Sequence, residues 1–153
     1  MTTDERNFFP KSERLCLKKD VDRLLDAGQS FISYPFRIVY LSYVGDLASG
    51  CAISILVSVP KKRIKQAVKR NRIKRLIREA FRLNKNETSA FYKLNEKNLH
   101  IAFLYICNDM KTFTVIEKAI LKTLEIIRRN EQVTKNGVLQ TQFSITSSLM
   151  HNA

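Results

Sequence analysis

Residues 67–82, AVKRNRIKRLIREAFR, constrain the fold more than any other stretch of this 153-residue chain. The stretch holds seven Lys or Arg residues and one acid. Its apolar residues recur at the 3.6-residue spacing of an α-helix: Val68, Ile73, Leu76, Ile77 and Ala80, with Phe81 at the margin. Polar residues recur on the opposite side: Asn71, Arg75, Arg78 and Arg82, with Lys74 beside them. The pattern predicts a helix that packs through its apolar stripe and presents guanidinium groups outward.

The positive charge of the chain is concentrated around this predicted helix. The net charge is +13, and residues 61–85 supply +11 of it, from twelve Lys or Arg and one Glu. A charge that served solubility alone would be spread over the surface, whereas a concentrated charge indicates a polyanionic partner. Like charges one turn apart also weaken a helix unless something neutralises them. A merely solvated charged face is therefore the less favoured interpretation.

Four apolar runs predict the strands of a sheet. They are residues 29–33, 36–43, 51–59 and 99–107. Residues 18–28 predict a short helix that Gly28 ends, and residues 114–129 predict a last amphipathic helix. The order is helix, three strands, the basic helix, a strand and a helix. This order favours an α+β fold, a two-layer sandwich in which helices cover one mixed four-stranded sheet.

A chain of this length forms one domain most simply, here residues 15–129. Residues 1–14 predict a flexible N-terminal arm, and residues 130–153 a disordered C-terminal tail. No apolar run approaches the roughly 18 residues of a membrane helix, and the N-terminus lacks a signal-peptide pattern. The three cysteines, Cys16, Cys51 and Cys107, lack metal-site spacing and favour a reducing compartment. We therefore expect a cytoplasmic protein without a membrane partner.

Nucleic acid is the polyanion that suits the basic helix best. Phosphate groups accept paired hydrogen bonds from arginine, and the Asn71 amide can both donate to and accept from a sugar hydroxyl or a base edge. A membrane surface is less favoured because the apolar stripe is needed against the sheet. The absence of a helix-turn-helix or zinc-finger pattern favours RNA over DNA.

No set of residues predicts a catalytic site in the protein itself. A protein nuclease needs paired carboxylates that hold metal ions, or a histidine with supporting groups. His100 falls in a strand and His151 in the tail. Asp20, Asp22 and Asp26 line the first helix, where the helix dipole and solvent explain them. We therefore expect no catalytic residue and no metal site.

Residues 70–82, RNRIKRLIREAFR, resemble the RNR signature of the bacterial ribonuclease P protein subunit. The resemblance extends over residues 12–129, through SERL, the helix ending in Gly28, and SVPKK before the basic helix. It implies an accessory subunit of a ribonucleoprotein endoribonuclease that removes the 5′ leader of precursor tRNA. The implied partners are the catalytic RNA subunit and precursor tRNA, and Mg²⁺ is the implied cofactor, bound mainly by the RNA. The resemblance also implies a left-handed strand-helix-strand crossover, against the general right-handed rule.

Carried over by position, the resemblance assigns RNA contacts to Lys61, Lys62, Arg70, Asn71, Arg72, Lys74, Arg75 and Arg78, and the helical face adds Arg82. The family often has Gly-Asn where this chain has Lys65 and Gln66, and the chain is one residue longer at Arg63.

The resemblance implies a second surface, a cleft between the first helix and the sheet, where aromatic side chains receive the single-stranded leader. The two helix positions fall on Val21 and Leu25, and the strand position falls on Val39. Phe36 and Tyr40 are the candidates to supply the missing rings.

The basic helix leaves two other functions open. One is a general structured-RNA-binding or ribosome-associated protein with no role in cleavage. The other is a DNA-binding regulator, which the lack of a duplex-binding motif disfavours.

Overall fold

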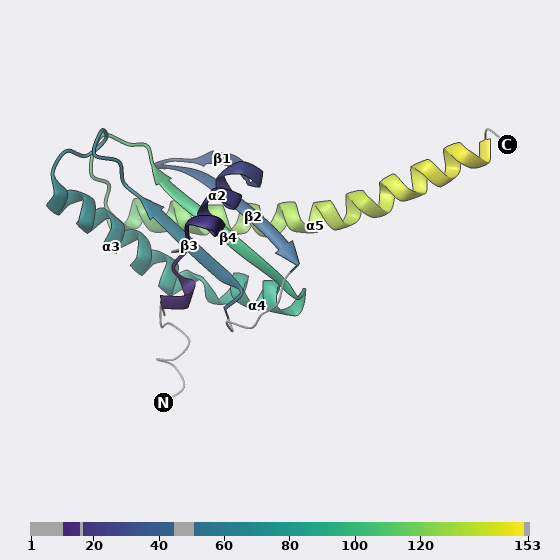
Figure 1. Ribbon diagram of the computed structural model, residues 1–153, viewed down its shortest axis with the longest axis horizontal. Helices are drawn as coiled ribbons and strands as arrows, with labels where there is room; N and C mark the ends of the chain where they lie inside the picture. Colours follow the sequence, from purple (N-terminus) through teal and green to yellow (C-terminus); the bar gives the residue numbers. More distant parts are fainter. Residues whose placement is uncertain (1–10, 16, 45–50, 152–153) are drawn as a thin grey trace, which may run out of the picture.

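The computed structural model describes residues 11–15, 17–44 and 51–151, with side chains through Val133. The elements, in chain order, are η1 (Lys11–Glu13), α2 (Lys18–Ala27), β1 (Gln29–Ser33), β2 (Phe36–Val44), β3 (Ile53–Ser58), α3 (Ala67–Asn84), α4 (Asn86–Leu94), β4 (Lys97–Tyr105) and α5 (Phe113–His151) (Figure 1). All four predicted strands and all three predicted helices are present. Among the described residues, no helix is both long enough and apolar enough to cross a lipid bilayer.

The strands form one mixed sheet in the order β1-β2-β4-β3. The pairs β1–β2 and β2–β4 are antiparallel, whereas β3 and β4 are parallel neighbours. The chain therefore crosses over between β3 and β4, through α3 and α4. With α2 in front and β3 and β4 pointing upward, β4 lies to the right of β3 while α3 lies behind the sheet (Figure 1). This arrangement is the left-handed crossover that the resemblance implies.

Helices cover both faces of the sheet. α3 and α5 pack on one face, where Ile73 and Ile77 of α3 join Ile101 and Phe103 of β4 in the larger core cluster. α2 covers part of the other face, where Leu24 packs with Val39 and Ala102 in a smaller cluster. β4 runs through the middle of the sheet and is buried on both sides, as its unbroken apolar run predicts.

Gly28 follows the last turn of α2, at a point where no side chain fits between the helix and β2. A Cβ atom at this position would lie 2.3 Å from the Leu24 carbonyl oxygen and 2.8 Å from Val39 Cγ1. The Gly28 amide also donates to the Leu24 carbonyl at 2.8 Å, which closes the last turn. The glycine that the sequence marks as a stop is therefore also the point of closest approach between α2 and the sheet.

The apolar stripe of α3 is displaced from the predicted one. Ile73, Ile77, Ala80 and Phe81 are fully buried, so Phe81 lies at the centre of the stripe and not at its margin. Val68 is 81% exposed and Leu76 is half-buried at the edge of the core. The prediction was wrong at Val68 because α3 meets the core only from Ile73 onward.

Between α3 and β4, where the sequence predicted no further element, Asn86–Leu94 form a helix, α4. This helix buries Thr88 and Tyr92, and Tyr92 belongs to the larger core cluster. Its polar composition conceals it in the sequence, because the burial of one tyrosine ring against β4 and α5 gives no periodic apolar pattern.

Both ends of the domain reach beyond their predicted limits. Residues 11–14, assigned to a flexible arm, form η1 and a bridge between Arg14 and Ile55. The last helix was expected to end at residue 129, but α5 continues to His151. The prediction of a disordered tail fails at its start, because Asn130 bonds to Tyr40 and Glu131 pairs with Lys97. These contacts are polar, so they extend the helix without an apolar repeat. Residues 1–10 lie outside the described residues.

Candidate nucleic-acid interface

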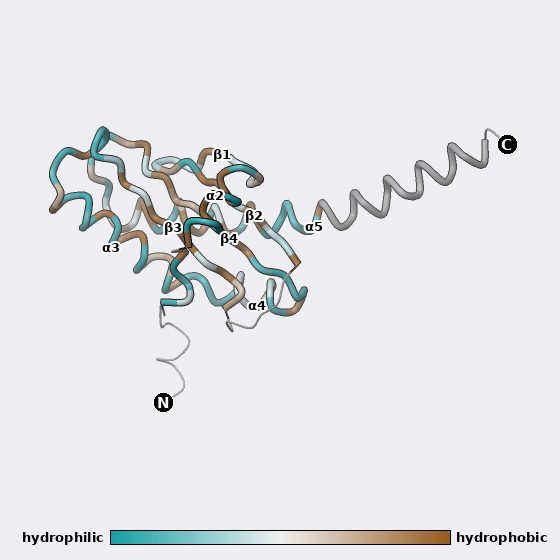
Figure 2. Tube along the Cα trace, viewed as in Figure 1, coloured by the Kyte–Doolittle hydropathy of each residue, from teal (hydrophilic) through white to brown (hydrophobic). Residues whose placement is uncertain are grey.

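The outer side of α3 and the turn before it form a cationic surface, which we call the α3 basic face. It comprises Lys61, Lys62, Arg70, Asn71, Arg72, Lys74, Arg75, Arg78 and Arg82. Five members are exposed and four are half-buried; the exposed members are Lys61, Lys62, Asn71, Arg72 and Arg75. The trace of α3 alternates between hydrophilic and hydrophobic residues, as a helix with one packed face requires (Figure 2).

Arg70 has a structural partner as well as a place on this surface. Its guanidinium donates to the carbonyl oxygens of Ile64 at 2.9 Å and Lys65 at 2.7 Å. Ile64 is itself buried in the core. Arg70 therefore fastens the turn of residues 61–66 to the first turn of α3, and so holds Lys61 and Lys62 beside the helix.

Arg82 shares its charge with an acid. Its guanidinium donates to both carboxylate oxygens of Glu79, at 2.5 and 3.0 Å. The hydrogen bonds raise the pKa of Arg82 and lower the pKa of Glu79. The C-terminal end of the α3 basic face therefore carries less net positive charge than the arginine count indicates.

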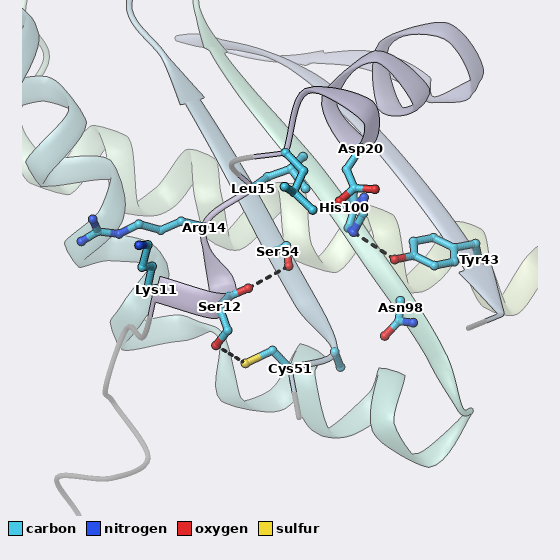
Figure 3. Close-up of a pocket in the computed structure, with 12 residues that line it drawn as sticks. Lys11, Ser12, Arg14, Leu15, Asp20, Tyr43, Cys51, Ser54, Asn98 and His100 are labelled. Atoms are coloured by element: carbon cyan, nitrogen blue, oxygen red, sulfur yellow. Dashed lines mark hydrogen bonds between the residues drawn. The ribbon is translucent and has the colours of Figure 1, made fainter. Parts of the chain in front are cut away.

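A cavity of about 480 Å³ opens on the opposite side of the sheet, between η1, α2 and the strands (Figure 3). Its lining includes Lys11, Arg14, Asp20, Tyr43, Asn98 and His100. Tyr43 and Asn98 are directly paired across β2 and β4, so their side chains stand on the same face.

The structure separates the five leader-cleft candidates. Val21 and Val39 pack in the smaller core cluster under α2, and Leu25 is half-exposed on that helix. Phe36 and Tyr40 belong to the larger cluster on the opposite face of the sheet. Side chains alternate along a strand, so even-numbered residues of β2 point toward α3 and α5. Phe36 and Tyr40 therefore do not supply rings to the cleft, and none of the five lines the cavity.

Tyr43 and His100 are the aromatic pair on the α2 side, and the sequence analysis did not assign them to the cleft. The Tyr43 hydroxyl lies 3.1 Å from His100 Nε2, and the two rings meet edge to face. The Arg23 guanidinium lies 4.6 Å from the centre of the Tyr43 ring. The alternation of β2 could have identified Tyr43. Residues two and four positions beyond Val39, which are Leu41 and Tyr43, lie on the same face of the strand as Val39.

Burial sets the protonation of this pair. It lowers the pKa of His100, with a further lowering from Arg23 against the opposing effect of Asp20. It also raises the pKa of Tyr43. Both side chains are therefore neutral near pH 7, and neutral aromatic rings suit a site that receives a nucleic-acid base.

The described residues contain no group of three or more His, Cys, Asp or Glu side chains placed to hold a metal ion. Three features of the described residues are suited to nucleic-acid binding. They are the α3 basic face, the turn of residues 61–66 that Arg70 fastens to α3, and the cavity between η1, α2 and the strands.

Comparison with known proteins gives one consistent result. The family model described as Ribonuclease P matches residues 9–128. The chain is 38% identical over 130 residues to the ribonuclease P protein component of Porphyromonas gingivalis, covering 85% of this chain and 93% of the relative. It is 31% identical over 136 residues to that of Chlorobium phaeobacteroides, covering 82% and 91%.

Solved structures agree with the sequence relatives. The RNase P protein of Staphylococcus aureus superimposes with a TM-score of 0.57 at 26% identity, over 76% of this chain and 96% of that one. The RNase P protein of Thermotoga maritima shares the fold, with a TM-score of 0.55 at 22% identity over 73% and 94% of the two chains.

Proposed function

This chain belongs to the ribonuclease P protein family, and we propose that its α3 basic face binds the RNA subunit of that ribonucleoprotein. The chain is the accessory protein component of an endoribonuclease that matures the 5′ end of tRNA. The observation that supports the binding proposal most directly is the two-sided character of α3. The helix buries Ile73 and Ile77 in the core while Asn71, Arg72 and Arg75 remain exposed.

Phosphate contacts of this kind make binding depend on salt. If the α3 basic face neutralises about six phosphates, the logarithm of affinity falls with the logarithm of salt concentration at a slope of roughly −4 to −5. Arg70 contributes indirectly to this interaction, because its bonds to Ile64 and Lys65 hold Lys61 and Lys62 near the same RNA backbone. Arg82 contributes less than Arg75, because Glu79 already engages its guanidinium.

The cavity under α2 is our candidate site for the single-stranded leader of precursor tRNA. Tyr43 offers a ring for stacking, and Lys11 and Arg14 line the same cavity. Stacking of a base on an aromatic side chain contributes about 1–3 kcal/mol. Tyr43 takes the role that the sequence analysis gave to Phe36 and Tyr40, which lie on the other face.

In this proposal the RNA subunit carries out the hydrolysis and binds the Mg²⁺ ions that support it. The described residues do not offer a divalent ion a cluster of acidic or histidine ligands, so no step is assigned to a metal held by the protein alone. The protein's own contribution is to bind and orient the two RNAs.

A cytoplasmic location belongs to the same proposal. Among the described residues, Cys51 and Cys107 are both free thiols. Free thiols suit a reducing compartment, where the RNA subunit and tRNA precursors are made.

Cleavage of precursor tRNA tests the function. The cognate RNA subunit is assayed at low magnesium concentration with and without the full-length chain, and we expect the chain to stimulate cleavage. Absence of stimulation, together with equal affinity for the RNA subunit and for unrelated structured RNAs, would support the general RNA-binding alternative instead.

A further inference from the structure

The N-terminal segment, residues 11–15, is a fixed part of the sheet edge. Arg14 forms a parallel bridge with Ile55 of β3, and the Leu15 amide donates to the Ile55 carbonyl at 2.8 Å. The Ser54 hydroxyl donates to the Ser12 carbonyl at 3.3 Å. These bonds satisfy part of the open edge of β3 and set the direction in which the Arg14 side chain leaves the backbone.

A buried ion pair fastens the same segment to the end of α3. Lys85, the residue that follows α3, donates from Nζ to both carboxylate oxygens of Glu13, at 2.6 and 2.8 Å. The two side chains are only 7% and 13% exposed. Such a pair is geometrically demanding, because two charges removed from water must be well aligned to offset the cost of their desolvation. The contact joins parts of the chain that are 72 positions apart.

The pair helps to hold a further arginine, Arg14, on the side of the segment that faces α3. The Arg14 side chain extends from the segment toward α3 (Figure 3). Arg14 is close enough to lower the pKa of Arg78, although burial is the larger cause of that shift. A phosphate group can accept hydrogen bonds from two guanidinium groups at once, so arginines from the two segments can bind the same phosphate.

We propose that Arg14 and Arg78 bind one phosphate group of the RNA together, and that the Glu13–Lys85 pair is the positioning device that makes this possible. The inference rests on the proposed function, because it adds a second chain segment to the surface that binds the RNA subunit. Arg14 also lines the cavity under α2, so this phosphate site lies between the α3 basic face and the candidate leader site.

A mutant cycle tests the shared phosphate. Affinity of the full-length chain for the cognate RNA subunit is measured across a salt series for Arg14→Ala, Arg78→Ala and the double variant. Each single change is expected to weaken binding roughly tenfold. The double variant should lose little more, and its salt slope should flatten by about 0.7–0.9, the value for one phosphate. Lys122→Ala, an exposed lysine of α5, is the control with the same change of charge.

Glu13→Gln tests the positioning device. The change adds one positive charge beside the RNA-binding surface, so simple electrostatics predicts tighter binding. Our inference predicts the opposite, a loss close to that of Arg14→Ala, together with faster hydrogen exchange of the Leu15 amide that bonds to Ile55. The exchanged pair, Glu13→Lys with Lys85→Glu, should recover part of both properties. Circular dichroism establishes that each variant is folded, and if Glu13→Gln unfolds, the Arg14 and Arg78 cycle decides alone.

The results separate this inference from the function beneath it. Wild-type chain that binds single-stranded oligouridylate as tightly as the RNA subunit would overturn the proposed function. Wild-type chain that prefers the RNA subunit, but in which the Arg14 and Arg78 losses simply add or Arg14→Ala has no effect, would overturn only the shared phosphate site. Tighter binding by folded Glu13→Gln would overturn the positioning role.

Discussion

At the scale of single residues, the arginines of α3 differ in what already engages them. Arg75 is exposed, and no hydrogen bond or ion pair of the described residues involves its side chain. Arg70 donates to two backbone carbonyls, and Arg82 pairs with Glu79. Because existing hydrogen bonds occupy some of the five N–H donors of a guanidinium, the arginines at these three positions do not offer a phosphate the same set of free donors.

Arg75→Ala should weaken RNA binding without changing stability. The side chain is exposed, so its removal leaves the core intact, and surface substitutions of this kind usually change stability by less than about 0.5 kcal/mol. The salt slope of binding should flatten by about 0.7–0.9 if one phosphate contact is lost. Affinity measured in a salt series and thermal unfolding of the same variant provide the check. A variant that unfolds would show that α3 is turned the other way.

Ile77→Ala should destabilise the chain by about 2–5 kcal/mol, because it leaves a cavity in the larger core cluster. Ile77 is fully buried. Denaturant unfolding measures the change, and Val68→Ala is the matched control on the same helix, since Val68 is largely exposed. Leu76, which the apolar stripe of the sequence also favours, is only half-buried and should cost less than Ile77. Equal losses at Val68 and Ile77 would contradict this orientation.

His100 should make stability depend on pH. Burial lowers the pKa of His100 in the folded chain, whereas the unfolded chain titrates near 6.5. Below that pH the unfolded state binds a proton that the folded state resists, so stability is complete above about pH 6.5 and falls as the pH decreases. Unfolding free energies of wild type and His100→Gln, compared between pH 5 and pH 8, isolate the effect. An identical pH dependence in the two proteins would rule it out.

At the scale of elements, the turn before α3 and the helix form one unit. Ile64 anchors the turn in the core, and the Arg70 guanidinium bonds to the carbonyls of Ile64 and Lys65. Gln66 provides no side-chain cap at the N-terminal end of α3, and the Arg70 side chain adds a link between the turn and the first turn of the helix to the backbone bond from Arg70 to Gln66. The hydrogen bonds of the Arg70 side chain to this turn thus help to set where Lys61 and Lys62 lie.

Arg70→Ala should loosen this turn while α3 remains folded. The predicted observation is faster trypsin cleavage after Lys61 and Lys62, since proteases cut exposed backbone most readily where it is least fastened. Arg72→Ala, exposed on the same helix, removes one charge without touching the turn and is the control. Equal cleavage rates in the two variants would show that Arg70 does not hold the turn.

At the scale of the whole molecule, α5 packs along one face of the sheet and contacts elements from both halves of the chain. It packs against α3, and it contacts β1 and β2. Near residue 130 it adds polar contacts, the Asn130 amide to the Tyr40 hydroxyl at 3.1 Å and the Glu131 carboxylate to Lys97. The domain therefore ends beyond the last residue matched by the family model, residue 128.

Two truncations test that boundary. A chain ending at Val133 keeps every contact of the described side chains and should unfold at nearly the wild-type denaturant concentration. A chain ending at Arg129 loses the contacts of Asn130 and Glu131 and should lose about 1–3 kcal/mol, because the Lys97 ammonium remains partly buried without its carboxylate. Equal stability of the two chains would place the end of the domain at Arg129.

Prediction from sequence succeeded where the signal is local. Three local features are confirmed, and each can be recognised within one short segment of the sequence. They are the unbroken apolar run of β4, the end of α2 at Gly28 and the helical period of α3. It failed at Phe36 and Tyr40, although the alternation of β2 already places both side chains on the face opposite Val39. It also missed α4, which packs through buried Thr88 and Tyr92 and partly buried Phe91, because these positions include too few apolar residues to show as a repeat.

The sequence by itself determined that this chain has a helix with an apolar side and a cationic side, and that it resembles the ribonuclease P protein family. Both properties follow from residue order along one segment, because the periods of helix and strand convert spacing directly into faces. Only the tertiary structure decided that Glu13 meets Lys85, that the Arg14 side chain extends toward α3 (Figure 3), and that Tyr43 pairs with His100. Those partners are far apart in the chain, so the strand order and the left-handed crossover, which no local pattern encodes, bring them together.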